Sequence, residues 1–131
     1  MNVERNLETI RRFYVAGPAL DDANRLPFFA PDAVWHVPGD NPVSGPYSGP
    51  AAITTDISAR MEPLDRWEIE VVDVMGNADM VVATVRLRAR RRGVEVESNG
   101  AHAFRLNAEG QVVEAWGFTA DQAGLDELFR A

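Results

Sequence analysis

From Asp65 onward, apolar and polar residues alternate along most of the chain, which is the period of a β-strand. Turn-forming residues divide this half into four segments, at residues 65–76, 79–91, 94–106 and 111–119. Connections of two to four residues join strands that run antiparallel and lie side by side. We therefore expect a four-stranded antiparallel meander to form most of the sheet.

The dipeptide Arg92-Gly93 sets the register of the central hairpin. If it forms a two-residue turn, Arg90 faces Glu95 and Arg88 faces Glu97, and facing opposite charges stabilise a strand pair. The other side then carries small and apolar pairs: Ala89–Val96, Leu87–Ser98, Val85–Gly100, Ala83–His102 and Val81–Phe104. This register makes the arginine cluster at 86–92 an ion-paired outer face, and an anion-binding patch is the alternative.

The first half of the chain has helical periodicity instead. Val3, Leu7, Ile10 and Tyr14 share one helical face, and Gly17-Pro18 ends that helix. Further helices are predicted over residues 21–30, from Ser48-Gly49-Pro50 to Met61, and over 121–129, with a short strand over 32–38 and a Gly/Pro-rich loop over 40–49. Helices followed by a meander predict a single α+β domain over residues 1–131, with helices packed on a strongly curved sheet.

Composition excludes several kinds of chemistry. The chain has no Cys and no Lys, which excludes disulfides, thiolate nucleophiles and lysine Schiff bases. A net charge of −7 argues against nucleic acid and anionic membranes as partners. Without a long apolar run or a signal peptide, a cytoplasmic location is expected. The two histidines, His36 and His102, lie far apart, and no metal or cofactor motif is present.

A polar group in an apolar pocket is predicted at His102. The hairpin register places its imidazole on the inner face, next to Phe104, where Ala83 and Gly100 leave space. A hydrogen-bonded core histidine is the structural alternative. A three-residue turn before the strand at 79–91 places Asp73 opposite Ala83, in the same row as His102 but one strand away. A one-residue shift in register instead sends Asp73 to solvent, and both alternatives remain open.

The phase of the last strand is the other open question. If Val113, Ala115 and Gly117 face inward, Trp116 and Phe118 face outward and predict a covered surface, most simply a homodimer interface. The opposite phase brings Glu114 and Trp116 into the pocket.

Three segments resemble the SnoaL-like proteins of the nuclear-transport-factor-2-like superfamily, which includes ketosteroid isomerases, polyketide cyclases and limonene epoxide hydrolase. They are Phe29 to Gly39 (FAPDAVWHVPG), Ser44 to Ile53 (SGPYSGPAAI) and His102 to Gly110 (HAFRLNAEG), followed by Trp116, Asp121 and Leu125. The resemblance implies a cystatin-like α+β cone around a ligand cavity, which is dimeric through the outer sheet face.

The catalytic residues of these enzymes are mostly absent when the resemblance is carried over. The aspartate base of the ketosteroid isomerases falls on Val37, their tyrosine on Phe13 or Tyr14, and their protonated aspartic acid on His102. The helical stripe favours Tyr14. Gly117 and Phe118 occupy the region of the aspartate of the cyclases and hydrolases, and Gly100 replaces the arginine of the hydrolases.

The sequence thus predicts His102 as the main polar catalyst, helped by Tyr14 and Asp73. Tyr14 can also be a packed aromatic. The family register turns His36 away from the pocket, and the predicted substrate-binding residues are Trp35, Val37, Phe28, Phe104 and Ala115. One hypothesis is an isomerase, cyclase or hydrolase acting on a small hydrophobic ring compound. A second is a binding protein without catalysis, and a scaffold without a ligand is the third.

Overall fold

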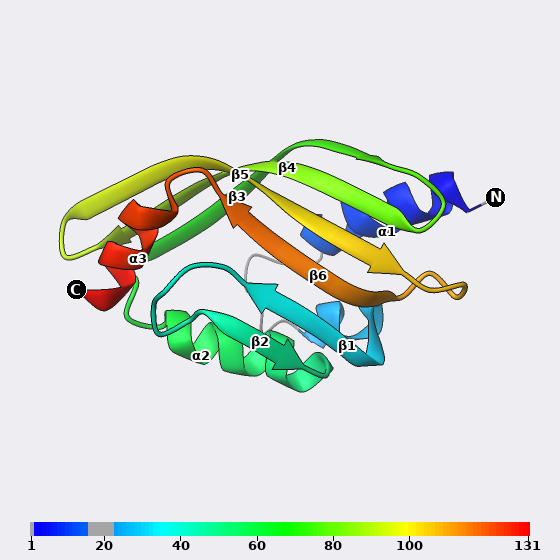
Figure 1. The fold of residues 1–131 in the computed structure, drawn as a ribbon, viewed down its shortest axis with the longest axis horizontal. Helices are drawn as coiled ribbons and strands as arrows, with labels where there is room; N and C mark the ends of the chain where they lie inside the picture. The colour runs from blue at the N-terminus through cyan, green and yellow to red at the C-terminus, as the bar shows by residue number, and fades with distance from the viewer. Residues whose placement is uncertain (1, 16–22) are drawn as a thin grey trace.

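A computed structural model describes residues 2–15 and 23–131. Its helices are α1 (Val3–Val15), the 3-10 helix η1 (Ala23–Phe28), the π-helix η2 (Ala52–Asp56), α2 (Ile57–Met61) and α3 (Gln122–Arg130). Its strands are β1 (Phe29–Val37), β2 (Gly45–Ser48), β3 (Arg66–Gly76), β4 (Met80–Arg91), β5 (Val94–Leu106) and β6 (Val112–Thr119). Figure 1 shows their arrangement.

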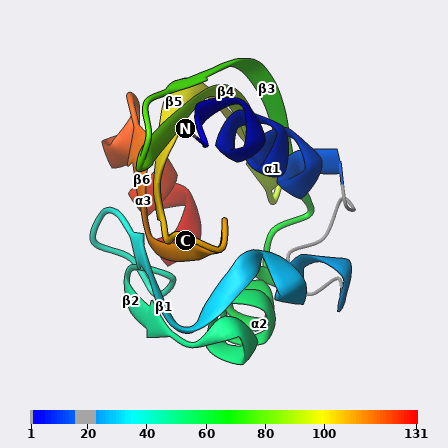
Figure 2. The ribbon, with the colours of Figure 1, turned by 90° about the vertical axis from the view of Figure 1, so that its right-hand side faces the viewer.

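The strands form one sheet in the order β2-β1-β6-β5-β4-β3. The pairing of β1 with β6 is parallel, and the other neighbouring pairs are antiparallel. The sheet curls from β3 round to β2 without closing, and the end-on view shows α1 near one edge and α2 near the other (Figure 2). The predicted α+β class, with helices packed on a curved sheet, is confirmed.

The predicted register of the central hairpin is confirmed along its whole length. Arg90 pairs with Glu95, Ala83 with His102 and Val81 with Phe104. Arg92 and Gly93 have φ values of 52° and 80°, so both adopt the left-handed backbone that a tight two-residue hairpin requires. On the outer face, Glu97 lies 3.5 Å from Arg88, whereas Glu95 makes its ion pair with Arg66 of β3, at 3.8 Å.

The helix predicted over 21–30 is wrong where the structure describes it. A 3-10 turn covers only 23–28, and Phe29 and Ala30 already belong to β1. Pro27 cannot donate a helical hydrogen bond, and burial of Phe29 and Ala30 against the core favours the strand. Residues 21 and 22 and the predicted helix end at Gly17-Pro18 lie outside the described residues.

Two further boundaries differ from the prediction. The loop predicted over 40–49 contains β2, because Trp35 pairs with Tyr47 and Tyr47 is buried. The following helix reaches Met61 as predicted, but it contains the π-helical turn η2.

The inward-facing residues of β6 follow the predicted phase except at its start. Ala115 and Gly117 face inward, opposite Phe104 and His102 of β5. The pairing between β5 and β6 is shifted at Val113, so Val112, rather than Val113, is buried in the core. A bulge places two consecutive residues opposite one and thereby reverses the alternation.

The outer face of β6 carries Trp116 and Phe118, and the Phe118 side chain is 57% exposed. The predicted homodimer through this face stays a prediction.

We expect Phe118→Arg to convert the protein from dimer to monomer, because a guanidinium without a partner is costly to bury between two copies. Light scattering measures the change, with Val94→Arg as the control because Val94 is 59% exposed at the hairpin tip. A monomeric wild type at micromolar concentration contradicts the prediction.

Candidate functional site

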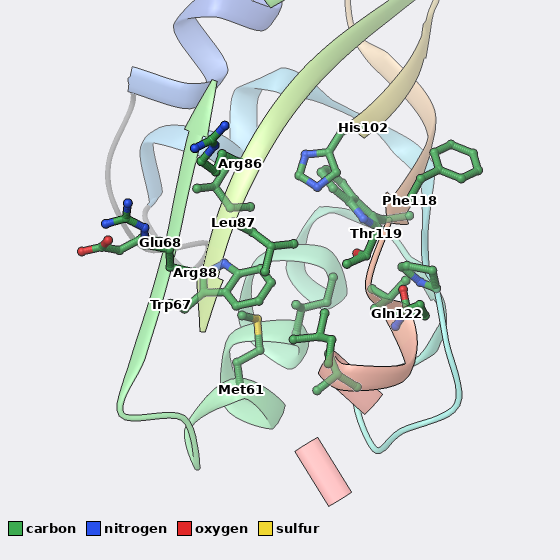
Figure 3. A pocket seen from close by; sticks show the side chains of 18 of the residues that line it. Met61, Trp67, Glu68, Arg86, Leu87, Arg88, His102, Phe118, Thr119 and Gln122 are labelled. Atoms are coloured by element: carbon green, nitrogen blue, oxygen red, sulfur yellow. The ribbon is translucent and has the colours of Figure 1, made fainter. Parts of the chain in front are cut away.

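A cavity of about 450 Å³ lies on the concave side of the sheet. Its wall is mostly apolar: Trp35 and Val37 come from β1, Met61 from α2, Trp67 from β3 and Leu125 from α3. His102 of β5 lies in this wall, and Figure 3 shows its ring at one end of the cavity. An apolar hollow with few polar groups is typical of a small-molecule site.

His102 and Tyr14 form a hydrogen-bonded pair. The Tyr14 hydroxyl lies 2.5 Å from Nδ1 of His102, and the two rings are nearly parallel. Tyr14 comes from α1, where the stripe predicted from the sequence turns it toward the sheet. The sequence therefore correctly placed His102 and Tyr14 in the same pocket, and the structure adds that they are in contact.

Burial keeps both members of this pair neutral. Desolvation lowers the pKa of His102 to about 4. Desolvation also raises the pKa of Tyr14 well above its usual range, and the positive charge of Arg25 only partly opposes this. A neutral phenol is a stronger hydrogen-bond donor than a neutral imidazole N–H, and an imidazole nitrogen is the stronger acceptor. We therefore assign Tyr14 as the donor to Nδ1, which leaves the ring hydrogen of His102 on Nε2. Nε2 has no hydrogen-bond partner among the described residues.

An aromatic cluster fixes the position of the pair. Trp35 packs edge-on against the His102 ring at 5.5 Å between centroids, and Phe104 packs against both. Phe13 contacts Tyr14 and Trp35 from α1. Edge-to-face packing of buried rings defines both position and orientation. The cluster thereby holds the imidazole in one orientation toward the cavity.

The predicted substrate-binding residues divide into two groups. Trp35 and Val37 line the cavity. Phe104 and Ala115 are fully buried behind its wall, and Phe28 packs against Phe13. These last three support the wall without lining the cavity. Phe104 and Ala115 face inward, as His102 and Gly117 do, but they are 0% exposed.

A polar cluster near the start of α3 was not predicted. The Asp126 carboxylate accepts hydrogen bonds from the Asp40 amide at 3.0 Å, from Asn41 Nδ2 at 2.6 Å and from Gln122 Nε2 at 2.7 Å. Asn41 and Gln122 both line the cavity. The only sequence signal was an asparagine in a Gly/Pro-rich loop, which by itself indicates a turn.

The SnoaL-like domain family matches residues 10–115, which is most of the chain. The chain belongs to the SnoaL-like family. This SnoaL-like chain is 28% identical over 131 residues to the uncharacterized protein Rv0034 of Mycobacterium tuberculosis (strain ATCC 25618 / H37Rv), with 98% of this chain and 99% of the relative covered.

Solved structures give the same fold for this SnoaL-like chain. A protein of unknown function with a cystatin-like fold from Xanthomonas campestris superposes with a TM-score of 0.83 at 26% identity, covering 96% of this chain and 98% of that one. TerC, co-crystallised with polyporic acid, superposes with a TM-score of 0.79 at 19% identity, covering 95% and 97%. The cystatin-like, NTF2-like fold implied by the resemblance is thus confirmed.

Asp73 does not join the pocket of the SnoaL-like chain. It pairs with Thr84, and Val74 takes the place opposite Ala83, because Gly76 pairs with Val81 and the connection at 77–80 is one residue longer than the three-residue turn assumed. The Asp73 side chain is exposed and accepts a hydrogen bond from the Val74 amide. Of the two alternatives, the shift that sends Asp73 to solvent is correct, and the prediction of Asp73 as a catalytic residue is wrong in its placement.

His36 and Glu114 lie on the outer face of the SnoaL-like sheet. Nε2 of His36 is 2.7 Å from a Glu114 oxygen, and Trp116 stacks on the His36 ring. Hydrogen bonds, first from Arg105 and then from His36, lower the pKa of Glu114. The alternative that turns Glu114 and Trp116 into the pocket is therefore wrong, and the prediction that His36 faces away is confirmed.

The described part of the SnoaL-like chain contains neither a cluster of metal-binding side chains nor a helix that could span a membrane. Within residues 2–15 and 23–131, no three His, Asp or Glu side chains come close enough together to hold a metal ion. Within the same ranges, no helix combines the length and the apolar character needed to cross a bilayer.

Proposed function

We propose that this SnoaL-like protein binds a small, mostly apolar ring compound that carries a carbonyl group. The observation that carries the proposal is the Tyr14–His102 hydrogen bond at the wall of an apolar cavity. With Nδ1 occupied by Tyr14, Nε2–H is the donor left for a ligand. A carbonyl oxygen is the acceptor that such a donor recognises in an apolar site.

Catalysis by this site would stabilise negative charge on the ligand oxygen. When a ketone loses a proton from its α-carbon to water or hydroxide, the carbonyl oxygen becomes an enolate oxygen. A donor held in place in a dry site stabilises that charge more strongly than water does. The family includes polyketide cyclases and isomerases, and we infer an isomerase or cyclase with His102 as hydrogen-bond donor.

The alternative function is binding without catalysis. It is favoured by Val37, which occupies the position that the resemblance assigns to the aspartate base and presents an apolar side chain to the cavity. A site of this kind would hold a carbonyl compound through His102 and leave its carbon–hydrogen bonds intact. The co-crystallisation of TerC with polyporic acid supports a small-molecule cavity in either case.

The experiment uses β-tetralone, a bicyclic ketone with acidic α-hydrogens, as the probe. We expect it to raise the melting temperature of the wild type by binding the folded state. We also expect the protein to accelerate deuterium exchange at its α-carbon in heavy water. Removal of one oxyanion donor typically costs about 10²–10³ in rate, so His102→Ala should lose almost all of the acceleration.

The controls separate the two functions. Tyr14→Phe keeps the ring but frees Nδ1, and we expect it to reduce exchange less than His102→Ala because the imidazole remains. A shift in melting temperature without accelerated exchange favours the binding protein. Exchange by His102→Ala at the wild-type rate shows that His102 is not the catalyst, and the proposal fails if no ring ketone stabilises the wild type.

A further inference from the structure

Thr119 is a second polar side chain in the wall of the cavity. It lies on β6 two residues after Gly117, so alternation along the strand turns both residues toward the concave side. Thr119 lines the cavity, and Figure 3 shows it between His102 and Gln122. Because His102 pairs with Gly117, Thr119 is its diagonal neighbour, about 7–8 Å away at the backbone. One ligand can therefore contact both side chains.

The hydroxyl of Thr119 is accessible and has no hydrogen-bond partner among the described residues. The Thr119 side chain is only partly buried. Within residues 2–15 and 23–131, Gln122 Oε1 is the one fully buried side-chain polar atom without a partner. The Thr119 hydroxyl is not such an atom, so it keeps surface that a ligand can touch. The amide groups of Asn41 and Gln122, by contrast, both donate to Asp126.

Two glycines keep the space between His102 and Thr119 clear. Gly117 pairs with His102 and Gly100 pairs with Thr119, so the position opposite each polar side chain across β5 and β6 carries no side chain. A Cβ on Gly117 would lie 3.8 Å from Cδ2 of His102. Cδ2 is bonded to Nε2, so this edge of the imidazole is turned toward β6, whereas Nδ1 faces Tyr14 of α1. The Nε2–H group and the Thr119 hydroxyl therefore border the same part of the cavity.

We propose that the Thr119 hydroxyl binds a hydroxyl group of the ligand, on the same ring system as the carbonyl that His102 binds. A threonine hydroxyl both donates and accepts, and so does a ligand hydroxyl, so the hydrogen bond can form in either direction. The ligand class is then a hydroxylated ring ketone. The carbonyl contact rests on the proposed function of His102, and Thr119 is a specificity-determining residue that adds recognition of the hydroxyl.

The test uses four derivatives of β-tetralone, with either a hydroxyl or a methyl group at carbon 6 or at carbon 7. The two groups are similar in size, and only the hydroxyl forms hydrogen bonds. Calorimetry gives the ratio of the dissociation constant of the methyl compound to that of the hydroxyl compound. At one of the two positions, we expect this ratio to be about five- to tenfold higher in the wild type than in Thr119→Val, which is the typical net value of one hydrogen bond.

Thr119→Val keeps the shape of the side chain and suits a strand, so the variant should fold. Thr119→Ser restores the hydroxyl and should recover the higher ratio. Thr84→Val, the same change on the outer face of β4, should keep the wild-type ratio. Equal ratios in the wild type and Thr119→Val at both positions overturn the assignment of Thr119, and binding of the probes then leaves the proposed function standing. Failure of all four probes to bind overturns both.

Discussion

Phe13→Ala is expected to lower the free energy of unfolding by about 3–5 kcal/mol, which is the usual cost of removing a buried aromatic ring from a core. The Phe13 side chain is 2% exposed. Its ring lies at the centre of the aromatic cluster, within 6.0 Å between centroids of Tyr14, Phe28, Phe29, Trp35 and Phe104. Because five rings pack around it, the wall cannot close over the space that the ring leaves.

Urea denaturation measures the effect, and Val15→Ala is the control on the same helix. Val15 is 81% exposed, so its truncation should change the free energy of unfolding by no more than about 0.5 kcal/mol. We also expect Phe13→Ala to weaken β-tetralone binding, because Tyr14 and Trp35 lose a neighbour that positions them. Similar losses in the two variants would show that the aromatic cluster is not the centre of the core.

The second large effect is a loss of folding stability at acidic pH, caused by His102. In the folded state the pKa of His102 is lowered to about 4, against an ordinary value of 6.5. Between these two values the unfolded chain binds a proton that the folded protein excludes. The contribution of His102 to the free energy of unfolding therefore falls as the pH drops from 6.5 to 4 and is constant above and below that window. The full loss is about 3 kcal/mol, on the order of 1.4 kcal/mol for each pH unit.

A comparison with His102→Gln isolates this contribution. Both proteins keep Glu114 and Asp126, so the acid dependence of those two carboxylates cancels in the difference. Chemical denaturation at pH values between 7.5 and 4 should show wild type losing its advantage over the variant, with most of the change below pH 6.5. A difference that stays constant over this range would mean that His102 titrates normally and is not held neutral by burial.

The strands and the inward position of His102 could be predicted because their signals are local. A two-residue turn leaves little choice of register, and the arginine–glutamate pairs agree with the same choice. One assumption at Arg92-Gly93 therefore placed Ala83, Gly100 and His102 correctly. The helical stripe placed Tyr14 for a similar reason, since side chains three and four residues apart share a face.

Asp73 was misplaced because the turn before β4 is one residue longer than assumed, with Gly76 paired with Val81, and a one-residue change moves a side chain to the other face. The Asp126 cluster was missed for another reason. Its hydrogen bonds join Asn41 and Asp40 to a residue 85 and 86 positions away. No local sequence pattern indicates a contact between residues so far apart in the chain. Only the folded chain shows that the Gln122 oxygen has no hydrogen-bond donor among the described residues.

The parallel pairing of β1 with β6 has a consequence for the order of assembly. Trp35 pairs with Ala115, and His102 pairs with Gly117, so both cavity residues depend on the last strand for a neighbour. While a nascent chain still lacks β6, the first strand has no bridge to the meander, and the ligand chamber has no continuous wall. Contacts that span so much of a chain are slow to form. The chamber is therefore a late product of folding, although Phe13, Tyr14 and Trp35 in its wall are translated early.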